Sequence, residues 1–403
     1  MKITPEFRRY LMGVAMFLMY MSMGMWLPSL PNILGAHHAR WALPYAFALT
    51  QAMGIFSSLL FAALSDRRFE AQNLLGILSL LGAGFLWLAF SALEWEWHPG
   101  WYLFFQSCNA LISAPMIPLI AKIKLANLPN PEKSFPLYSL CGTIGWLMAG
   151  LIVSGLSLDV SATTGRIAAC IRVLMGCVCF ILPVTLPEDR TSRGWKAALG
   201  LGAFGLLKNK QLRVFYVASI LITIPYISFF MFVPMMLIAF GSESPAAQMT
   251  IGQCTEVIAM LILSLLAGHY KMKSLMLASI LLGVTRFVLL ALSGVTGLLP
   301  VIWLGIALHG PIYTFMTIAG RIFIDRQVPS ALRGQAQALY GLLTMNVAGI
   351  LGSFFCEMVY QRTVLTTANN WVGMWIIMAV WAIVSLSYFF VGVSRQSPDV
   401  KAT

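Results

Sequence analysis

Residues 65–93 read SDRRFEAQNLLGILSLLGAGFLWLAFSAL, and their pattern indicates the fold class. It opens with a short charged segment and continues from residue 71 as an apolar run without a single charge. At about 1.5 Å of rise per residue, such a run is long enough to cross a bilayer as a helix. In lipid, its backbone polar groups can be satisfied only within a helix or a closed barrel, and barrel strands would be short and alternating. We therefore predict a membrane-spanning helix.

The same alternation of charged gaps and apolar runs continues through the chain. Of its 403 residues, 59% are hydrophobic and only 10% are charged, whereas roughly a quarter of the residues of a soluble domain are charged. We predict an all-α membrane protein with twelve transmembrane helices. The predicted spans are residues 10–34, 41–64, 71–93, 99–121, 135–157, 166–186, 211–240, 246–267, 273–294, 298–323, 333–358 and 371–393.

The basic residues predict the orientation in the membrane. The formal net charge is +12, but Lys and Arg lie in the short gaps between spans, where the positive-inside rule places them, so we expect no nucleic-acid partner. With a cytoplasmic N-terminus, 21 of the 26 basic residues lie on the cytoplasmic side, and only Arg40, Arg166 and Arg362 lie opposite. We predict an integral inner-membrane protein with both termini in the cytoplasm.

A long polar stretch near the middle of the chain separates six predicted helices from six. We predict a six-helix half over residues 1–190, a cytoplasmic linker over residues 191–210 and a second half over residues 211–403. Two such halves are typical of transporters built from internal repeats. The aqueous gaps are too short for a catalytic domain, and the sequence contains no phosphate loop or metal-ligand cluster. We therefore predict neither an enzyme nor a bound cofactor or metal.

Thr143 and Trp146 lie near the middle of the span over residues 135–157, on one face of the helix. A hydroxyl can hydrogen-bond a ribose, and an indole can stack on a base. The alternative is helix packing, because Gly142 and Gly145 are small residues that allow another helix to approach closely.

Glu256 is the only carboxylate deep within a predicted span, and Gln253 lies one turn before it. An ionised carboxylate at the bilayer centre costs about 2.5–3.5 kcal/mol. Such a group faces a wet cavity, takes up a proton or pairs with a cation. A buried ion pair with Arg286 is the structural alternative to a binding site.

His309 and Tyr313 are four residues apart and share one face of the span over residues 298–323. An intramembrane histidine is either a hydrogen-bonded structural residue or a proton relay, and both interpretations remain open here.

A polar stripe of Gln106, Asn109 and Ser113 follows one face of the span over residues 99–121. Such a stripe either lines a cavity or joins two helices by hydrogen bonds. Arg172 is expected to extend toward the outer end of its helix, where a long side chain reaches water, and we assign it no role.

Several stretches of the sequence resemble the nucleoside:proton symporter family of the major facilitator superfamily. The gap that contains Asp66, Arg67 and Arg68 is similar to the loop signature of that superfamily. The family pattern is carried, in chain order, by SDRRFEAQNLLGILSLLGAGFL, CGTIGWLMAG, IGQCTEV, RFVLLALSG and RGQAQALYGLLTMNVAGILGSF. The resemblance covers most of the chain. It implies a major facilitator fold with a cavity between the halves, and nucleoside uptake driven by protons.

The resemblance also implies roles for individual residues. Its substrate contacts fall on Thr143, Trp146, Gln253 and Glu256, and its aromatic positions fall on His309 and Tyr313, with Asn109 as a further cavity candidate. The loop of Asp66, Arg67 and Arg68 would serve as a gate.

Two positions depart from the family pattern. Thr314 replaces an aspartate associated with proton coupling, and Ser139 replaces a substrate-contacting arginine. Coupling would then depend on Glu256, with His309 as the second candidate. The departures also leave open an uncoupled facilitator, or a transporter of the same fold for an oligosaccharide, a nucleobase or an exported drug-like compound.

Overall fold

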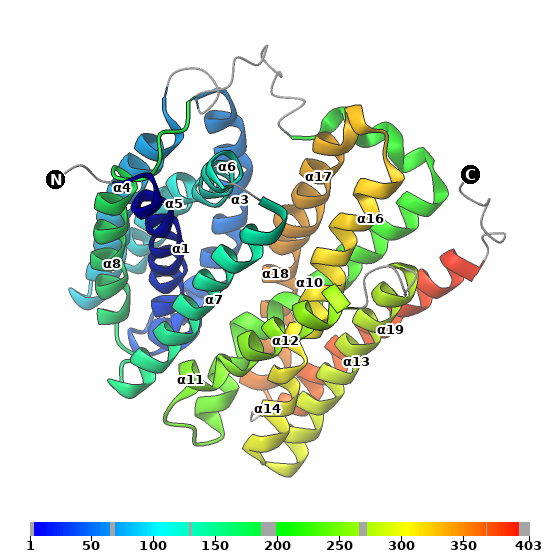
Figure 1. Ribbon diagram of the computed structural model, residues 1–403. Coiled ribbons are helices and arrows are strands. Elements are labelled where there is room, and N and C mark those ends of the chain that lie inside the picture. The colour runs from blue at the N-terminus through cyan, green and yellow to red at the C-terminus, as the bar shows by residue number, and fades with distance from the viewer. Residues whose placement is uncertain are drawn as a thin grey trace. The chain divides into compact units, whose positions relative to one another are not determined.

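The computed structural model describes residues 4–64, 69–128, 131–186, 199–265, 272–367 and 369–394, and within these ranges its regular structure is entirely helical (Figure 1). Asp66, Arg67 and Arg68, which form the predicted gating loop, lie outside the described residues.

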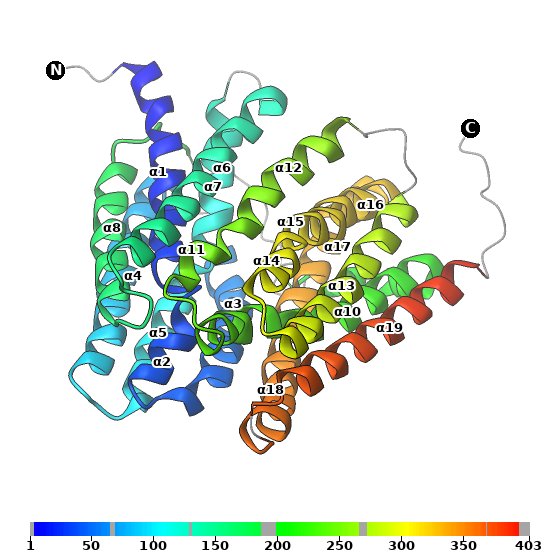
Figure 2. The same ribbon diagram turned by 90° about the horizontal axis from the view of Figure 1, so that it is seen from below.

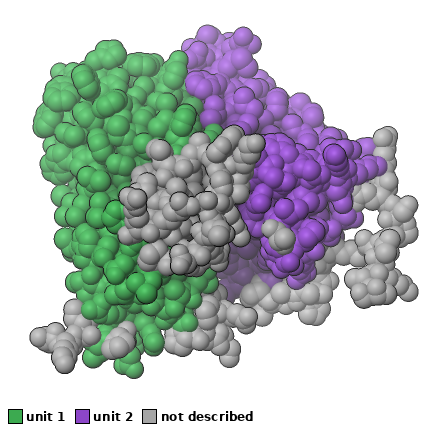
Figure 3. Space-filling model, turned by 90° about the horizontal axis from the view of Figure 1, so that it is seen from above, with its two compact units in different colours: residues 1–198, 230–253 green, residues 199–229, 254–403 purple. Residues whose placement is uncertain are grey.

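The chain divides into two compact units, which Figure 3 shows in different colours. Unit 1 comprises residues 1–198 and 230–253, and unit 2 comprises residues 199–229 and 254–403. Residues 230–253 therefore belong to unit 1, although they follow the predicted linker in sequence. The division into two six-helix halves stays a prediction.

Unit 1 holds the first eight helices and one short later helix. They are α1 (Pro5–Trp26), α2 (Leu30–Ala36), α3 (Leu43–Leu64), α4 (Ala71–Glu94), α5 (Pro99–Ser113), α6 (Met116–Asn127), α7 (Pro131–Gly155), α8 (Thr163–Cys179) and α11 (Pro245–Met249). The units share two helices, α10 (Lys210–Ala239) and α12 (Ile251–Leu265).

Unit 2 holds the remaining helices, several of which are interrupted by short π-helical stretches. They are α13 (Met272–Thr296), α14 (Leu299–Ala307), α15 (His309–Tyr313), η3 (Thr314–Ile318), α16 (Ala319–Gln327), α17 (Arg333–Gly341), η5 (Leu342–Val347), α18 (Ala348–Tyr360), η6 (Gln361–Leu365) and α19 (Trp371–Ser394). A 3-10 segment, Leu201–Lys208, precedes α10.

In the described part of the chain, 10 helices are long and apolar enough to cross a membrane. The predicted all-helical membrane architecture is confirmed, whereas the count of twelve spans stays a prediction. Several predicted boundaries are wrong. The spans predicted over residues 99–121 and 333–358 continue to Asn127 and Leu365. The span over residues 166–186 instead ends early, because α8 stops at Cys179. Pro183 follows within four residues, and proline disfavours helical conformation in the residue before it.

The outer surface of the helices is strongly apolar. More than half of the residue surface is exposed at Leu151, Leu261, Val384 and Phe390. In water, large exposed apolar surface marks a binding or aggregation site, but on membrane helices it is the surface that faces lipid.

Prolines interrupt the predicted helices unequally. The predicted span over residues 99–121 is divided at Pro115 into α5 and α6, whereas α10 runs unbroken through Pro225. Proline lacks an N–H, so Pro225 leaves the Leu221 carbonyl without its helical partner. The Trp381 indole donates a hydrogen bond to that carbonyl at 2.8 Å, which explains how the helix tolerates this proline.

Helices α1 and α7 cross at small residues, and the two ribbons lie side by side in Figures 1 and 2. A Cβ atom at Gly145 would collide with the Phe17 carbonyl, and one at Gly24 would lie 3.1 Å from the Trp146 Cα. The glycines of α7 therefore serve helix packing, as one interpretation of the sequence predicted.

Candidate functional site

Helix α7 presents three distinct faces, and the predicted site residues lie on one of them. Gly142, Gly145 and Ala149 are buried, whereas Ile144 and Met148 are exposed. Ser139, Thr143 and Trp146 are only partly buried and follow one another at i, i+4 and i+7, so they share the third face. We call these three residues the α7 polar face. Glycine packing and a polar face thus coexist on the same helix.

A lysine that the sequence interpretation passed over lies at one end of the α7 polar face. The Lys124 ammonium donates a hydrogen bond to the Ser139 hydroxyl at 2.9 Å, and the Lys124 side chain is almost completely buried. The structure therefore places a cation beside Ser139, the residue for which the family resemblance implies an arginine. The spacing of the sequence could have indicated that Lys124 is buried, because Met116, Ile120 and Lys124 follow one another at i+4 intervals on one buried face of the helix.

At the opposite end of this face, α7 meets α11. A Cβ at Gly150 would lie 2.5 Å from the Thr250 methyl group and 2.9 Å from the Ala246 carbonyl. Helix α12 begins directly afterwards and carries Gln253, whose side-chain oxygen is buried without a hydrogen-bond partner among the described residues. A buried acceptor without a hydrogen bond raises the free energy of the folded protein unless another group donates to it. Gln253 is therefore a suitable contact for a ligand that carries a donor.

In unit 2, α12 and α15 touch through a glycine. The Gly310 N–H donates to the Thr255 hydroxyl at 3.3 Å, and a Cβ at Gly310 would collide with the backbone at Thr255 and Glu256. This crossing places partly buried Glu256 beside the helix that carries His309 and Tyr313. The structure therefore brings together three of the predicted site residues, Glu256, His309 and Tyr313.

His309 is almost completely buried in an aromatic stack. Its ring lies 5.2 Å from Phe229 and 6.1 Å from Tyr313, with interplanar angles of 12° and 13°. Its Nδ1 lies 2.8 Å from the Tyr226 hydroxyl, so these two groups are hydrogen-bonded. The structure supports a positioned histidine, and it adds Tyr226 of α10, a residue that the sequence analysis did not select.

Arg286 is fully buried beside the same stack. Its guanidinium carbon lies 4.4 Å from the Phe229 ring centroid and 5.1 Å from that of Tyr226, which are cation–π distances. Among the described residues, none of its three nitrogens pairs with a carboxylate. The ion pair with Glu256, our structural alternative, is therefore not formed here. The Thr314 hydroxyl, at the position of the family aspartate, is likewise buried and has no partner among the residues described.

The polar stripe of α5 is part of a buried network. Arg172 donates to the Asn109 side-chain oxygen and to the Ser113 hydroxyl, each at 2.6 Å, and the Asn109 amide donates to Gln106 at 3.2 Å. Our expectation that Arg172 reaches toward water is wrong, since only 6% of its surface is exposed. The close approach of Gly82, whose Cβ would lie 3.3 Å from the guanidinium, leaves room for this buried position.

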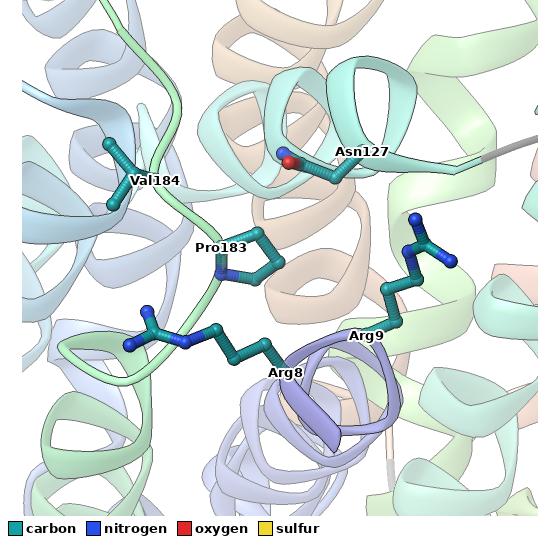
Figure 4. A pocket seen from close by; sticks show the side chains of 5 residues that line it. All are labelled: Arg8, Arg9, Asn127, Pro183 and Val184. Atoms are coloured by element: carbon teal, nitrogen blue, oxygen red, sulfur yellow. The ribbon is translucent and has the colours of Figure 1, made fainter. Parts of the chain in front are cut away.

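A small open pocket lies elsewhere in unit 1 and contains none of the predicted site residues (Figure 4). Its lining includes Arg8 and Arg9, which leave α1 in different directions, and Asn127. Arg8 donates to the Leu182 carbonyl at 3.2 Å. Within the described residues, no group of three His, Cys, Asp or Glu side chains could hold a metal ion.

Comparison with known proteins places the chain in a family. Residues 7–397 match the model of the nucleoside H+ symporter family. The chain is similar to YegT of Escherichia coli (strain K12), at 29% identity over 86% of this chain and 85% of that one. It is also similar to the nucleoside permease NupG of the same organism, at 25% identity over 85% and 84%. The xanthosine permease of that organism is 23% identical over 94% of each chain.

Solved structures give the same fold. The crystal structure of the nucleoside transporter NupG matches with a TM-score of 0.83 at 22% identity, covering 96% of this chain and 100% of that one. A D-xylose–proton symporter matches with a TM-score of 0.70 at 14% identity, over 95% and 96% of the two chains. The chain is therefore a membrane transporter with the major facilitator fold, not an enzyme, and it belongs to the nucleoside H+ symporter family.

Proposed function

We propose that this protein moves nucleosides together with protons across the inner membrane by alternating access. The observation that carries the proposal is the match to the nucleoside H+ symporter family over residues 7–397. The proposed nucleoside contacts are Thr143, Trp146, Gln253, Glu256, His309 and Tyr313. Glu256 is the proposed proton carrier, with His309 as the second candidate, and Asp66, Arg67 and Arg68 are the proposed gating loop.

Several observations support these assignments. Trp146 is partly buried on the α7 polar face and can stack on a base. The unpartnered oxygen of Gln253 can accept a hydrogen bond from a hydroxyl or an amino group. Glu256 lies beside the helix of His309 and makes no ion pair with Arg286. It is therefore available for a solute or a proton.

Asn109 requires a different assignment. Its side-chain oxygen accepts hydrogen bonds from both Arg172 and Ser113. We propose that it supports the fold of unit 1 in this conformation rather than contacting solute directly.

Flux into proteoliposomes tests the proposed function. Labelled nucleosides should enter vesicles that contain the protein, whereas oligosaccharides should not. Trp146→Ala and Gln253→Ala should each weaken nucleoside affinity by about 1–3 kcal/mol, because one loses a stacked ring and the other a hydrogen bond. Ile144→Ala, on the exposed face of the same helix, is the matched control and should retain affinity. Wild-type affinity in both site variants would place the binding site elsewhere.

Both termini are proposed to lie in the cytoplasm, as the distribution of basic residues predicts. Reporter domains fused after Arg395 and within residues 191–196 should both report the cytoplasmic side. A fusion within residues 157–162, which follow α7, should report the opposite side. An external signal from either of the first two fusions would overturn this topology.

A further inference from the structure

Asp159 lies in the short connection between α7 and α8 and is 5% exposed. Its Oδ1 accepts a hydrogen bond from the Ala246 N–H at 2.7 Å and another from the Ser154 hydroxyl at 3.0 Å. The Ser154 oxygen in turn accepts from the Ala247 N–H at 2.9 Å. One side chain from the last turn of α7 and one from the connection that follows it therefore hold the first turn of α11.

This arrangement is a helix cap supplied from a distant part of the chain. The first N–H groups of a helix have no partner within the helix and require an external acceptor. Ser244, the residue that would normally cap α11, makes no side-chain cap hydrogen bond. The acceptor comes from Asp159 instead, 87 residues earlier in sequence.

The carboxyl group is buried without a described cation nearby. Its second oxygen, Oδ2, has no hydrogen-bond partner in the part of the chain that the structure describes. The groups that face Asp159 are the Ser154 hydroxyl and backbone N–H groups, which are neutral. Arg166 on the adjoining α8 pairs with Glu94 at 3.1 Å instead, and Glu243 before α11 is exposed. Burial raises the pKa of Asp159 above its ordinary value, although its hydrogen bonds partly oppose that shift.

We propose that Asp159 is a positioning residue that latches α11 and the start of α12 to α7 in this conformation, and that the latch opens and closes during transport. The inference rests on the proposed alternating access. Helix α12 begins at Ile251, directly after α11, and carries Gln253. Within unit 1, the latch therefore joins the residues that lead into Gln253 to the helix that bears Thr143 and Trp146.

The equilibrium between the open and the closed latch should depend on pH. Asp159 is buried only while the latch is closed, and an open latch would expose it to water and return its pKa toward the ordinary range. The closed state therefore has the higher pKa and binds a proton more tightly. Between the ordinary pKa and the raised pKa, a fall in pH should shift the population toward the closed latch. Above both pKa values, the ionised group is present in both states and the dependence on pH disappears.

The latch can be measured directly by pulsed electron paramagnetic resonance. Spin labels at Leu156→Cys and Glu243→Cys, both exposed positions beside the latch, would report its two states as two distances. The five native cysteines that are not buried would be replaced by serine; they are Cys108, Cys141, Cys170, Cys177 and Cys254. Asp159→Ala removes both hydrogen bonds and should raise the fraction with the longer distance about tenfold.

Asp159→Asn provides the critical comparison. Its amide oxygen can still accept from Ala246 and Ser154, so the latch should form, but the side chain no longer titrates. The wild-type protein should therefore gain short-distance population as the pH falls, and Asp159→Asn should not. Glu96→Gln, an exposed carboxylate in another loop, is the control and should behave as the wild type.

Each outcome decides a separate question. Unchanged distances in Asp159→Ala would overturn the latch, and a persistent pH response in Asp159→Asn would overturn its response to protons. If Asp159→Ala does not fold, Ser154→Ala removes one bridge and should produce a smaller shift of the same sign. Nucleoside flux by the unlabelled wild-type protein is measured in parallel. Absence of wild-type flux would contradict the proposed function, whereas normal flux with unchanged distances would contradict only the latch.

Discussion

Glu256→Gln is expected to abolish pH-driven accumulation of nucleoside while nucleoside exchange across the vesicle continues. The substitution keeps the shape of the side chain and much of its hydrogen bonding but removes its titration. A pH gradient of one unit stores about 1.4 kcal/mol per proton, which supports about tenfold accumulation when one proton accompanies each solute. The wild-type protein should approach this ratio, and Glu256→Gln should equilibrate the nucleoside without concentrating it.

The matched control is Glu357→Gln, which changes a buried glutamate of α18 that accepts a hydrogen bond from Gln361 at 3.1 Å. This variant should accumulate nucleoside as the wild type does. No response of the wild type to the gradient would identify an uncoupled facilitator, consistent with Thr314 in place of the family aspartate. Normal accumulation by Glu256→Gln would transfer the proposed role to His309, and His309→Gln would then be tested in the same assay.

Asn109→Leu is expected to destabilise the protein by about 2–4 kcal/mol, because it leaves the charge of Arg172 buried without its main acceptor. The Arg172 nitrogens lie 2.6 Å from both Asn109 and Ser113, and leucine cannot replace the lost amide oxygen. The unfolding equilibrium in mixed micelles measures this change. The nucleoside affinity of the folded fraction should remain close to that of the wild type.

A double variant separates a structural role from a contact with solute. Asn109→Leu combined with Arg172→Met removes the buried charge together with its acceptor, and such apolar replacements of buried polar groups are often neutral or stabilising. The double variant should therefore be more stable than Asn109→Leu alone. If Asn109→Leu instead lost nucleoside affinity at unchanged stability, Asn109 would be a solute contact, as the sequence interpretation first allowed.

The class of the protein could be predicted from its sequence alone. A run such as residues 71–93 must be helical in a membrane whatever surrounds it, because its backbone has no other partner there. The structure accordingly has α4 over Ala71–Glu94. The family could also be predicted from the sequence, because its motifs are continuous segments of the chain. The points at which proline interrupts a helix were harder to predict from the sequence. One predicted span is divided at Pro115, whereas another continues through Pro225, because the distant Trp381 indole donates to the carbonyl that this proline leaves without a partner.

The contacts of the polar side chains could not be predicted from the sequence. Asn109 and Arg172 are 63 residues apart, and Asp159 and Ala246 are 87 apart, so no local pattern connects them. Spacing can place Thr143 and Trp146 on one face of a helix, but it cannot show that Lys124 lies at the end of that face. Helix formation and hydropathy depend on neighbours in sequence, whereas burial of a charge and the partners of a hydrogen bond depend on which helices pack together.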